Sequence, residues 1–264
     1  MSDMVSTTRM AVTMNDSSFI RITIDGPIAT IILNRPEKLN ALNYEMLAAL
    51  EEAARTIDQD SSVRVAILTG TGEKAFCAGA DIKAWSALRP IQMWSDWVRV
   101  GHRVFDQLAR IRQPLICALN GIAFGGGLEL ALTADFRLAS AHAQLAFPEV
   151  TIGTVPGWGG TRRLPALIGP ARAKEMILTG KRIDAEIALR WGLVNDVVPA
   201  QELTNRAYEL ADSIAKNAGV AVQLAKQVID ANDAGTVAAF ESLAGALAAT
   251  TEEGQQGVAK FLKK

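Results

Sequence analysis

Two spacings of apolar residues alternate along the chain up to about Pro199. Residues 19–36 alternate apolar and polar side chains on both sides of Asp25-Gly26, which predicts two antiparallel strands joined by a tight turn. Residues 41–60 repeat apolar positions every three or four residues, which is the spacing of a helix with one buried face. The expected buried stripe of this helix is Leu42, Met46, Leu50, Ala53 and Ala54.

Apolar runs without a polar face predict buried strands between such helices. Three of these runs are VRVAILTG (63–70), PLICALNG (114–121) and FRLAS (136–140). Strands that alternate with helices are typical of an α/β fold.

Three segments with different patterns divide the chain. Residues 1–18 are polar and are expected to form a mostly disordered tail, whereas 19–198 carry the alternating strand and helix signals of a core. Residues 199–264 show only helical spacing, with an Ala-rich stretch near the end. The small residues on these helices suit close packing, either on the same core or on another subunit.

Composition and charge exclude several classes of protein. Of the 264 residues, 49% are hydrophobic and 21% are charged, which is typical of a packed globular chain. The net charge of −1 gives no basic field for nucleic acid or an anionic membrane. No apolar run reaches the ~20 residues that span a bilayer. Cys77 and Cys117 do not form a disulfide framework, so we expect reduced thiols and a cytoplasmic location.

Two short segments resemble each other and each follows a predicted strand. AFCAGAD (75–81) and AFGGGLE (123–129) both consist of Ala-Phe, small residues and an acid. Chance similarity is one explanation, because short matches are common. The other is that they are equivalent loops in successive turns of a repeating β-α coil, which would place them side by side.

Loops of this kind can stabilise negative charge. Small residues let backbone N–H groups approach a ligand, and the first N–H groups of a helix have no partner within it. Two such loops together would supply an oxyanion hole. Glu129 falls in the first turn after one loop, and Glu149 precedes a Gly/Pro-rich stretch. Both glutamates are candidates for proton transfer, although a helix-start charge or a solvated loop residue explains each equally simply.

Five motifs in order resemble the enoyl-CoA hydratase/isomerase, or crotonase, family, and the resemblance covers nearly everything after about residue 19. The motifs are NRPEKLNAL (34–42), AFCAGADIK (75–83), NGIAFGGGLELAL (120–132), FPEVTIGTVPGWGGTRRL (147–164) and ALRWGLVNDVVP (188–199). The resemblance implies a spiral of ββα turns over 19–198 that holds a CoA site. It also implies a helical trimerisation region over 199–264, with trimers that often pair into hexamers, and an acyl-CoA thioester as ligand.

The resemblance also assigns roles by position. The N–H groups of Ala80 and Gly126 would form the oxyanion hole, Glu129 would activate water, and Glu149 would protonate the α-carbon of the thioester. Related isomerases often lack the first glutamate, so the presence of both favours a hydratase. The implied substrate-binding residues, among which the Ala78 carbonyl would lie near the CoA adenine, are Lys38, Ala78, Asp81, Ile82, Lys83, Gly125, Phe261 and Lys264. Many relatives continue beyond the position of Lys264.

Tryptophans mark a departure from the pattern of the resembled family. Trp158 occupies a position that is commonly small in its hydratases, so we expect it to narrow or redirect the acyl pocket. Trp85, Trp94 and Trp97 fall in the segment that lines this pocket in relatives, although ordinary core packing explains them as well.

Other activities remain open at this point. The same enolate chemistry serves double-bond isomerisation, retro-aldol cleavage and thioester hydrolysis, and some relatives bind RNA. His102 and His142 lie outside the catalytic motifs, which does not favour hydrolysis.

GTGEKA (70–75) matches a dinucleotide fingerprint, but no long amphipathic helix follows it. We therefore expect no cofactor beyond the CoA of the substrate, and no metal. A weak basic stripe is formed by Arg99, Arg103, Arg110 and Arg112.

Overall fold

The N-terminal hairpin forms around the turn that the alternation predicts. A computed structural model describes residues 12–13, 19–231 and 234–262. Strands β2 (Ile20–Asp25) and β3 (Ile28–Leu33) pair antiparallel, and Gly26 in the turn has φ +56°. Strand β1 (Val12–Thr13), within the segment 1–18 expected to be mostly disordered, pairs antiparallel with β2. The other residues of that segment lie outside those described.

Successive pairs of strands build two sheets, which confirms the predicted α/β spiral. In the described part of the chain the larger sheet has the order β1-β2-β3-β4-β6-β8-β11 and the smaller one β10-β9-β7-β5. Each turn gives its first strand to the large sheet and its second to the small sheet. The first strands are β4 (Val65–Gly70), β6 (Leu115–Leu119) and β8 (Phe136–Ser140), and the second strands are β5 (Ala75–Cys77), β7 (Ile122–Phe124) and β9 (Gln144–Ala146).

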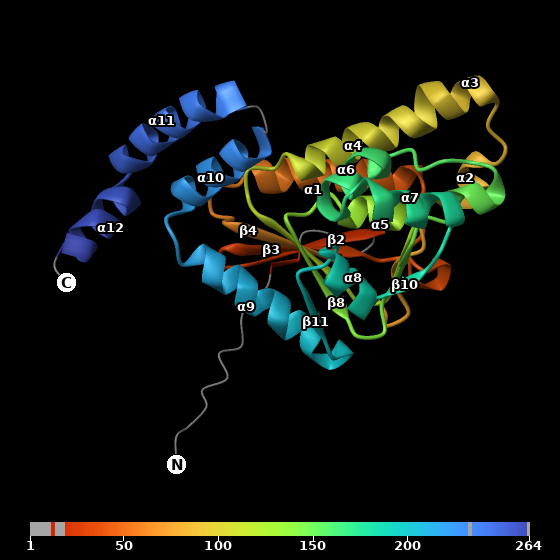
Figure 1. Cartoon of the computed structure of the whole chain (residues 1–264). Coiled ribbons are helices and arrows are strands. Elements are labelled where there is room, and N and C mark those ends of the chain that lie inside the picture. The colour runs from red at the N-terminus through yellow and green to blue at the C-terminus, as the bar shows by residue number, and fades with distance from the viewer. Residues whose placement is uncertain (1–11, 14–18, 232–233, 263–264) are drawn as a thin grey trace, which may run out of the picture.

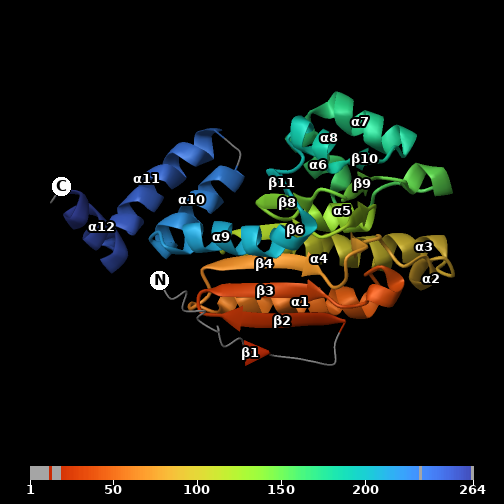
Figure 2. The ribbon, with the colours of Figure 1, turned by 90° about the horizontal axis from the view of Figure 1, so that it is seen from below.

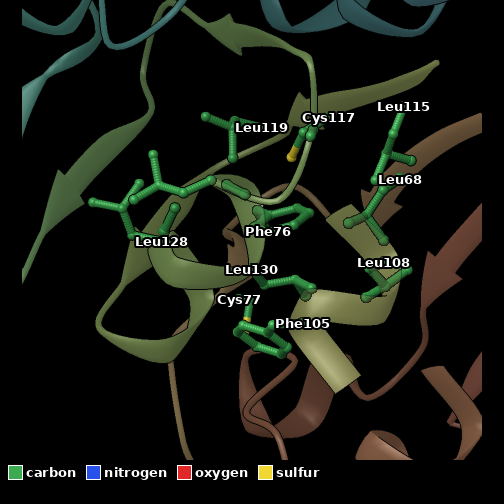
Figure 3. Close-up of a cluster of buried hydrophobic side chains, with 14 of the residues drawn as sticks. Leu68, Phe76, Cys77, Phe105, Leu108, Leu115, Cys117, Leu119, Leu128 and Leu130 are labelled. Atoms are coloured by element: carbon green, nitrogen blue, oxygen red, sulfur yellow. The ribbon is translucent and has the colours of Figure 1, made fainter. Parts of the chain in front are cut away.

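Helices α1 (Tyr44–Gln59) and α4 (Arg99–Ala109) cover one face of the large sheet. The Asn43 side chain caps α1 by accepting from the Met46 N–H. Met46, Leu50 and the two alanines are buried on this helix as predicted, but Leu42 lies before it and bridges to Ala80. The short helix α5 (Gly126–Ala131) is buried among these elements, and its Leu128 and Leu130 enter the cluster seen in Figure 3.

The C-terminal region is helical, as the sequence predicts. Helix α9 (Leu203–Ala215) packs on the opposite face of the large sheet through Leu203, Ala207 and Ala211. Helices α10 (Gly219–Ala231), α11 (Ala234–Thr250) and α12 (Glu252–Leu262) lie together at one end of the molecule, as both views of the ribbon show (Figures 1 and 2). None of the helices within the described ranges is long and apolar enough to cross a membrane.

Shorter elements connect these layers. They are the 3-10 turns Pro36–Lys38, Glu149–Ile152 and Ala200–Glu202, the π-helical turn Met93–Val98, helices α2 (Ile82–Trp85), α3 (Pro90–Gln92), α6 (Gly160–Ile168), α7 (Pro170–Thr179) and α8 (Ala185–Trp191), and strands β10 (Ile183–Asp184) and β11 (Asp196–Val198).

Candidate active site

The two similar loops lie side by side, as the repeat hypothesis predicts. Their strands β5 and β7 pair in parallel, with Cys77 opposite Ala123. Beyond the strands, a Cβ built on Gly126 would lie 3.4 Å from the Ala80 nitrogen, so the two loops nearly touch. Within the described residues neither the Ala80 nor the Gly126 N–H donates to another protein atom. Two free donors therefore lie together.

Glycine is required where the second loop turns. Gly125 has φ +50°, a conformation that strains other residues, and a Cβ there would lie 2.8 Å from Oε1 of Glu149. The absence of a side chain on Gly125 thus lets the Glu149 carboxyl group lie against the loop that carries the Gly126 N–H.

Glu129 lies on α5 with a side chain that is almost completely buried. Its exposed fraction is 2%. Oε1 accepts hydrogen bonds from the backbone N–H groups of Trp158, at 2.7 Å, and Gly160, at 2.8 Å. Burial raises the pKa of Glu129, while the backbone N–H groups of residues 157, 158 and 160 oppose the rise by stabilising the carboxylate. Helix α5 therefore directs the Glu129 carboxylate inward, and the Trp158 and Gly160 N–H groups hold one of its oxygens in place.

Glu149 begins the 3-10 turn Glu149–Ile152 and has a different environment. Its Oε2 is buried and has no hydrogen-bond partner among the described residues. Burial raises the pKa of Glu149 to about 7, and the nearby charge of Glu129 contributes in the same direction. A carboxyl group that titrates near neutrality and lacks a partner can exchange protons with a bound molecule.

The Trp158 indole fills the space behind the two loops. It is 2% exposed, and a Cβ on Gly126 would lie 2.7 Å from its Cζ3. Its ring packs on Trp97 and Phe105, with centroids 5.2 Å away in each case, and a Cβ on Gly101 would collide with it. The Trp158 indole is thus in contact with the loop that carries the Gly126 N–H, and its effect on an acyl pocket stays a prediction.

The other tryptophans of this region differ in exposure. Trp97 is buried in the core, Trp85 is partly buried, and Trp94 is 63% exposed. Core packing therefore accounts for Trp97, whose ring packs on Trp158 and Tyr44.

The expected CoA-binding residues of the N-terminal half gather at one edge of the loops. The bridge between Leu42 and Ala80 brings residues 34–42 against 78–83. Lys38 and Lys83 are exposed there, as is Ile82, and the Ala78 N–H donates to the Leu39 carbonyl.

Asp81 already has partners at this edge. It forms an ion pair with Arg35 at 2.7 Å and caps α2 by accepting from the Lys83 N–H. Burial opposes ionisation of Asp81, but these hydrogen bonds outweigh it and lower its pKa. The Asp81 side chain therefore orders the loop, and its contact with the ligand stays a prediction.

Two of the expected ligand contacts, Phe261 and Lys264, lie at the C-terminus. Phe261 belongs to the last turn of α12, and Lys264 lies outside the described residues. Two arginines of the basic stripe have partners: Arg103 donates two hydrogen bonds to Glu51, and Arg112 donates to the Asp58 carbonyl.

Two charged residues near Glu129 were not singled out from the sequence. Arg163 is 9% exposed, and it contacts both the Trp158 carbonyl and Asp106 of α4. The repeated basic residues of GTRRL, inside an otherwise apolar and glycine-rich motif, were the available signal. His102 lies near this pair, and His142 contacts the Glu73 carbonyl.

One buried and one half-buried carboxyl group lie beside two free backbone N–H donors on a ββα spiral, an arrangement typical of an enzyme site that can stabilise negative charge. Comparison with known proteins agrees with this class. The family model for enoyl-CoA hydratase/isomerase matches residues 23–264, and the chain belongs to that family.

Individual relatives are similar over most of their length. The chain is 43% identical to the short-chain-enoyl-CoA hydratase of Clostridium acetobutylicum over 243 residues, which are 91% of this chain and 93% of the relative. It is 44% identical to the carnitinyl-CoA dehydratase of Salmonella arizonae over 212 residues, 80% of each chain. The crystal structure of enoyl-CoA hydratase from Bacillus anthracis superposes with a TM-score of 0.89 at 40% identity, covering 93% of this chain and 96% of that one.

Proposed function

We propose that this protein is an enoyl-CoA hydratase, which adds water across the double bond of a 2-trans-enoyl-CoA to give a 3-hydroxyacyl-CoA. The observation that supports this most is that the Ala80 and Gly126 N–H groups lie beside the buried carboxyl group of Glu129 and the half-buried one of Glu149, which have unlike environments. The relatives named for hydration and dehydration of acyl-CoA thioesters support the same chemistry.

The reaction begins with the thioester oxygen bound between the Ala80 and Gly126 N–H groups. Polarisation of this carbonyl makes the β-carbon electrophilic. Glu129 takes a proton from a water molecule as the water oxygen bonds to that carbon, and the electrons move through the α-carbon into an enolate. Glu149 then donates its proton to the α-carbon and restores the thioester. The donors act on the charge that develops on oxygen, which is the term of largest effect in such reactions.

The unequal hydrogen bonding supports this division of roles. Glu129 accepts from two backbone N–H groups, which favour its charged form and suit it to act as a base. Glu149 has an unpartnered oxygen, and burial raises its pKa to about 7, so it holds a proton to donate.

Incubation in oxygen-18 water with a panel of enoyl-CoA thioesters, followed by mass spectrometry, tests the reaction. A product that keeps CoA and gains labelled water is expected. A product of unchanged mass with a moved double bond would show isomerisation, and free acid or a shortened acyl-CoA would show hydrolysis or carbon–carbon cleavage. Any of these last three as the main product contradicts the proposal.

Substitution of each glutamate tests the assignment of roles. Glu129→Gln and Glu149→Gln should each lower turnover about 10²-fold or more, the usual scale of general acid–base catalysis. Binding of butyryl-CoA, a saturated thioester that cannot be hydrated, should persist. Glu175→Gln is the matched control, because Glu175 pairs with Lys181 at the surface. Near-normal hydration by both active-site variants would show that the assignment is wrong.

The same proposal extends to the ligand. We infer that Lys38 and Lys83 contact the CoA phosphates and that Ala78, Ile82 and Gly125 line the path of the thioester. The exposure of both lysines beside the two loops supports this. We also infer that no cofactor other than the CoA of the substrate enters the reaction, and that the protein serves fatty acid metabolism in the cytoplasm.

We further propose that the protein assembles as a trimer or as a pair of trimers. Ile229 is 78% exposed, and Leu243 and Leu247 are 67% and 52% exposed, so α10 and α11 present apolar side chains that another subunit would cover. Light scattering during size-exclusion chromatography measures this directly. A monomer at micromolar concentration would contradict it.

A further inference from the structure

The backbone of one residue, Trp158, links Glu129 to the charged pair formed by Arg163 and Asp106. The Trp158 N–H donates to Glu129 Oε1, while the carbonyl of the same residue accepts from Arg163 Nη1 at 3.0 Å. The Gly160 N–H provides the second bond to Glu129. The conformation of residues 157–160 therefore decides whether both donors point at the carboxylate.

The guanidinium of Arg163 is itself fixed. It is buried, and its Nη2 is paired with Asp106 of α4. A buried cation without a partner is costly, so this pair holds Arg163 in one position. Gly159 has φ +104°, and a Cβ at that position would collide with Nη1. The glycine thus lets the guanidinium lie directly against the backbone that it orders.

We propose that Arg163 is a positioning residue, which with Asp106 fixes residues 157–160 so that two backbone N–H groups hold the Glu129 carboxylate. The inference rests on the proposed function in that Glu129 is the base of hydration. Neither Arg163 nor Asp106 touches the reacting atoms; both act through the backbone.

The charged groups around Glu129 predict how its pKa should respond to the loss of Arg163. Besides the N–H donors, Glu129 is faced by Glu149 of the 3-10 turn, by Arg163 of α6 and by His102 of α4. Loss of Arg163 removes a positive charge and frees residues 157–160, and both changes disfavour the carboxylate. The titration of Glu129 should then move to higher pH.

Arg163→Met is compared with Arg162→Met. Arg162 is the matched control, because it is the adjacent arginine and also approaches Asp106, at 3.4 Å, but its side chain is 69% exposed. Steady-state hydration of crotonyl-CoA gives kcat and KM. The titration of Glu129 is followed in the full chain by carbon-13 NMR with labelled glutamate carboxyl groups, and Glu129→Gln identifies the signal. Asp106→Asn, which keeps the side-chain shape, serves as a second variant if Arg163→Met does not fold.

We expect Arg163→Met to lower kcat by about 10²-fold, the scale of a misplacement near 1 Å, with KM little changed and the Glu129 titration shifted upward. Arg163→Lys should recover part of both effects, and Arg162→Met should resemble the unaltered protein. Equal behaviour of Arg163→Met and Arg162→Met overturns the inference. The inference is also overturned if Arg163→Met loses activity only in proportion to its loss of butyryl-CoA binding sites, with the pKa of Glu129 unchanged. If the unaltered protein hydrates no enoyl-CoA, the proposed function fails, and the titration still decides the positioning role.

Discussion

The pH dependence of hydration is the sharpest test of how burial prepares Glu149. Burial raises the pKa of this carboxyl group from 4.5 to about 7, and the neighbouring Glu129 adds to the rise. A group with the ordinary value would be protonated in only about 0.3% of molecules at pH 7, whereas one with a pKa near 7 is protonated in about half. The buried environment therefore increases the fraction of molecules with a proton to donate by about 150-fold.

The direction of the effect follows from the role of the proton. Hydration needs Glu149 protonated and Glu129 ionised, so kcat/KM should fall above pH 7 and approach a tenfold loss for each further pH unit. At pH 8 about a tenth of the molecules would keep the Glu149 proton. At acid pH the rate should fall again, when Glu129 also takes up a proton.

Measurement of kcat/KM from pH 5.5 to 9 with crotonyl-CoA, followed by loss of the enoyl-thioester absorbance, gives this profile. Dehydration of 3-hydroxybutyryl-CoA uses the same singly protonated pair in reverse, so its kcat/KM profile should superimpose on that of hydration. A hydration rate that stays constant from pH 6.5 to 9, or a dehydration rate that rises through this range, would refute the reasoning.

Two further predictions concern packing and stability. Trp158→Ala should remove the indole that touches Gly126, raise the kcat/KM for octenoyl-CoA relative to crotonyl-CoA, and lower the free energy of unfolding by about 3–5 kcal/mol. Phe105→Leu, on the far side of the same indole, should leave the chain-length ratio unchanged. Lys226→Met should lower that free energy by about 3 kcal/mol in urea titrations, because it leaves the buried end of Asp135 without its 2.8 Å partner. Loss of the more exposed pair of Arg206 with Asp196 should cost below about 1 kcal/mol.

Local pattern predicted the α/β class and some local arrangements, whereas the ββα spiral was implied by the resemblance to a family. The alternation around Asp25-Gly26 and the similarity of 75–81 to 123–129 each led to an arrangement that the strand pairing confirms. Leu42 shows where spacing fails. Its position fits the apolar stripe of α1, but the Asn43 cap starts the helix after it, and Leu42 pairs with a loop that is distant in sequence.

Contacts made by side chains across the fold were beyond the sequence. Nothing in the chain order indicates that the Trp158 ring lies against both Gly126 and Gly101, since three separate elements meet there. The same holds for Arg163 and Asp106, whose pairing depends on how α4 and α6 pack. Resemblance to a family assigned roles to both glutamates, but it gave no physical reason for the difference between them.

That reason lies in the hydrogen bonds each carboxyl group can form. Burial raises the pKa of both carboxyl groups, although Glu129 is almost completely buried and Glu149 only partly. The 157–160 segment opposes this rise at Glu129, because its N–H groups donate to one oxygen of Glu129 and favour its charged form. Glu149 lies against the Gly125 turn with a buried oxygen that no described residue satisfies, which favours its protonated form. We therefore expect backbone donors to distinguish the proposed base from the proposed acid, and a substitution that disturbs 157–160 should impair proton transfer even though both carboxyl groups remain.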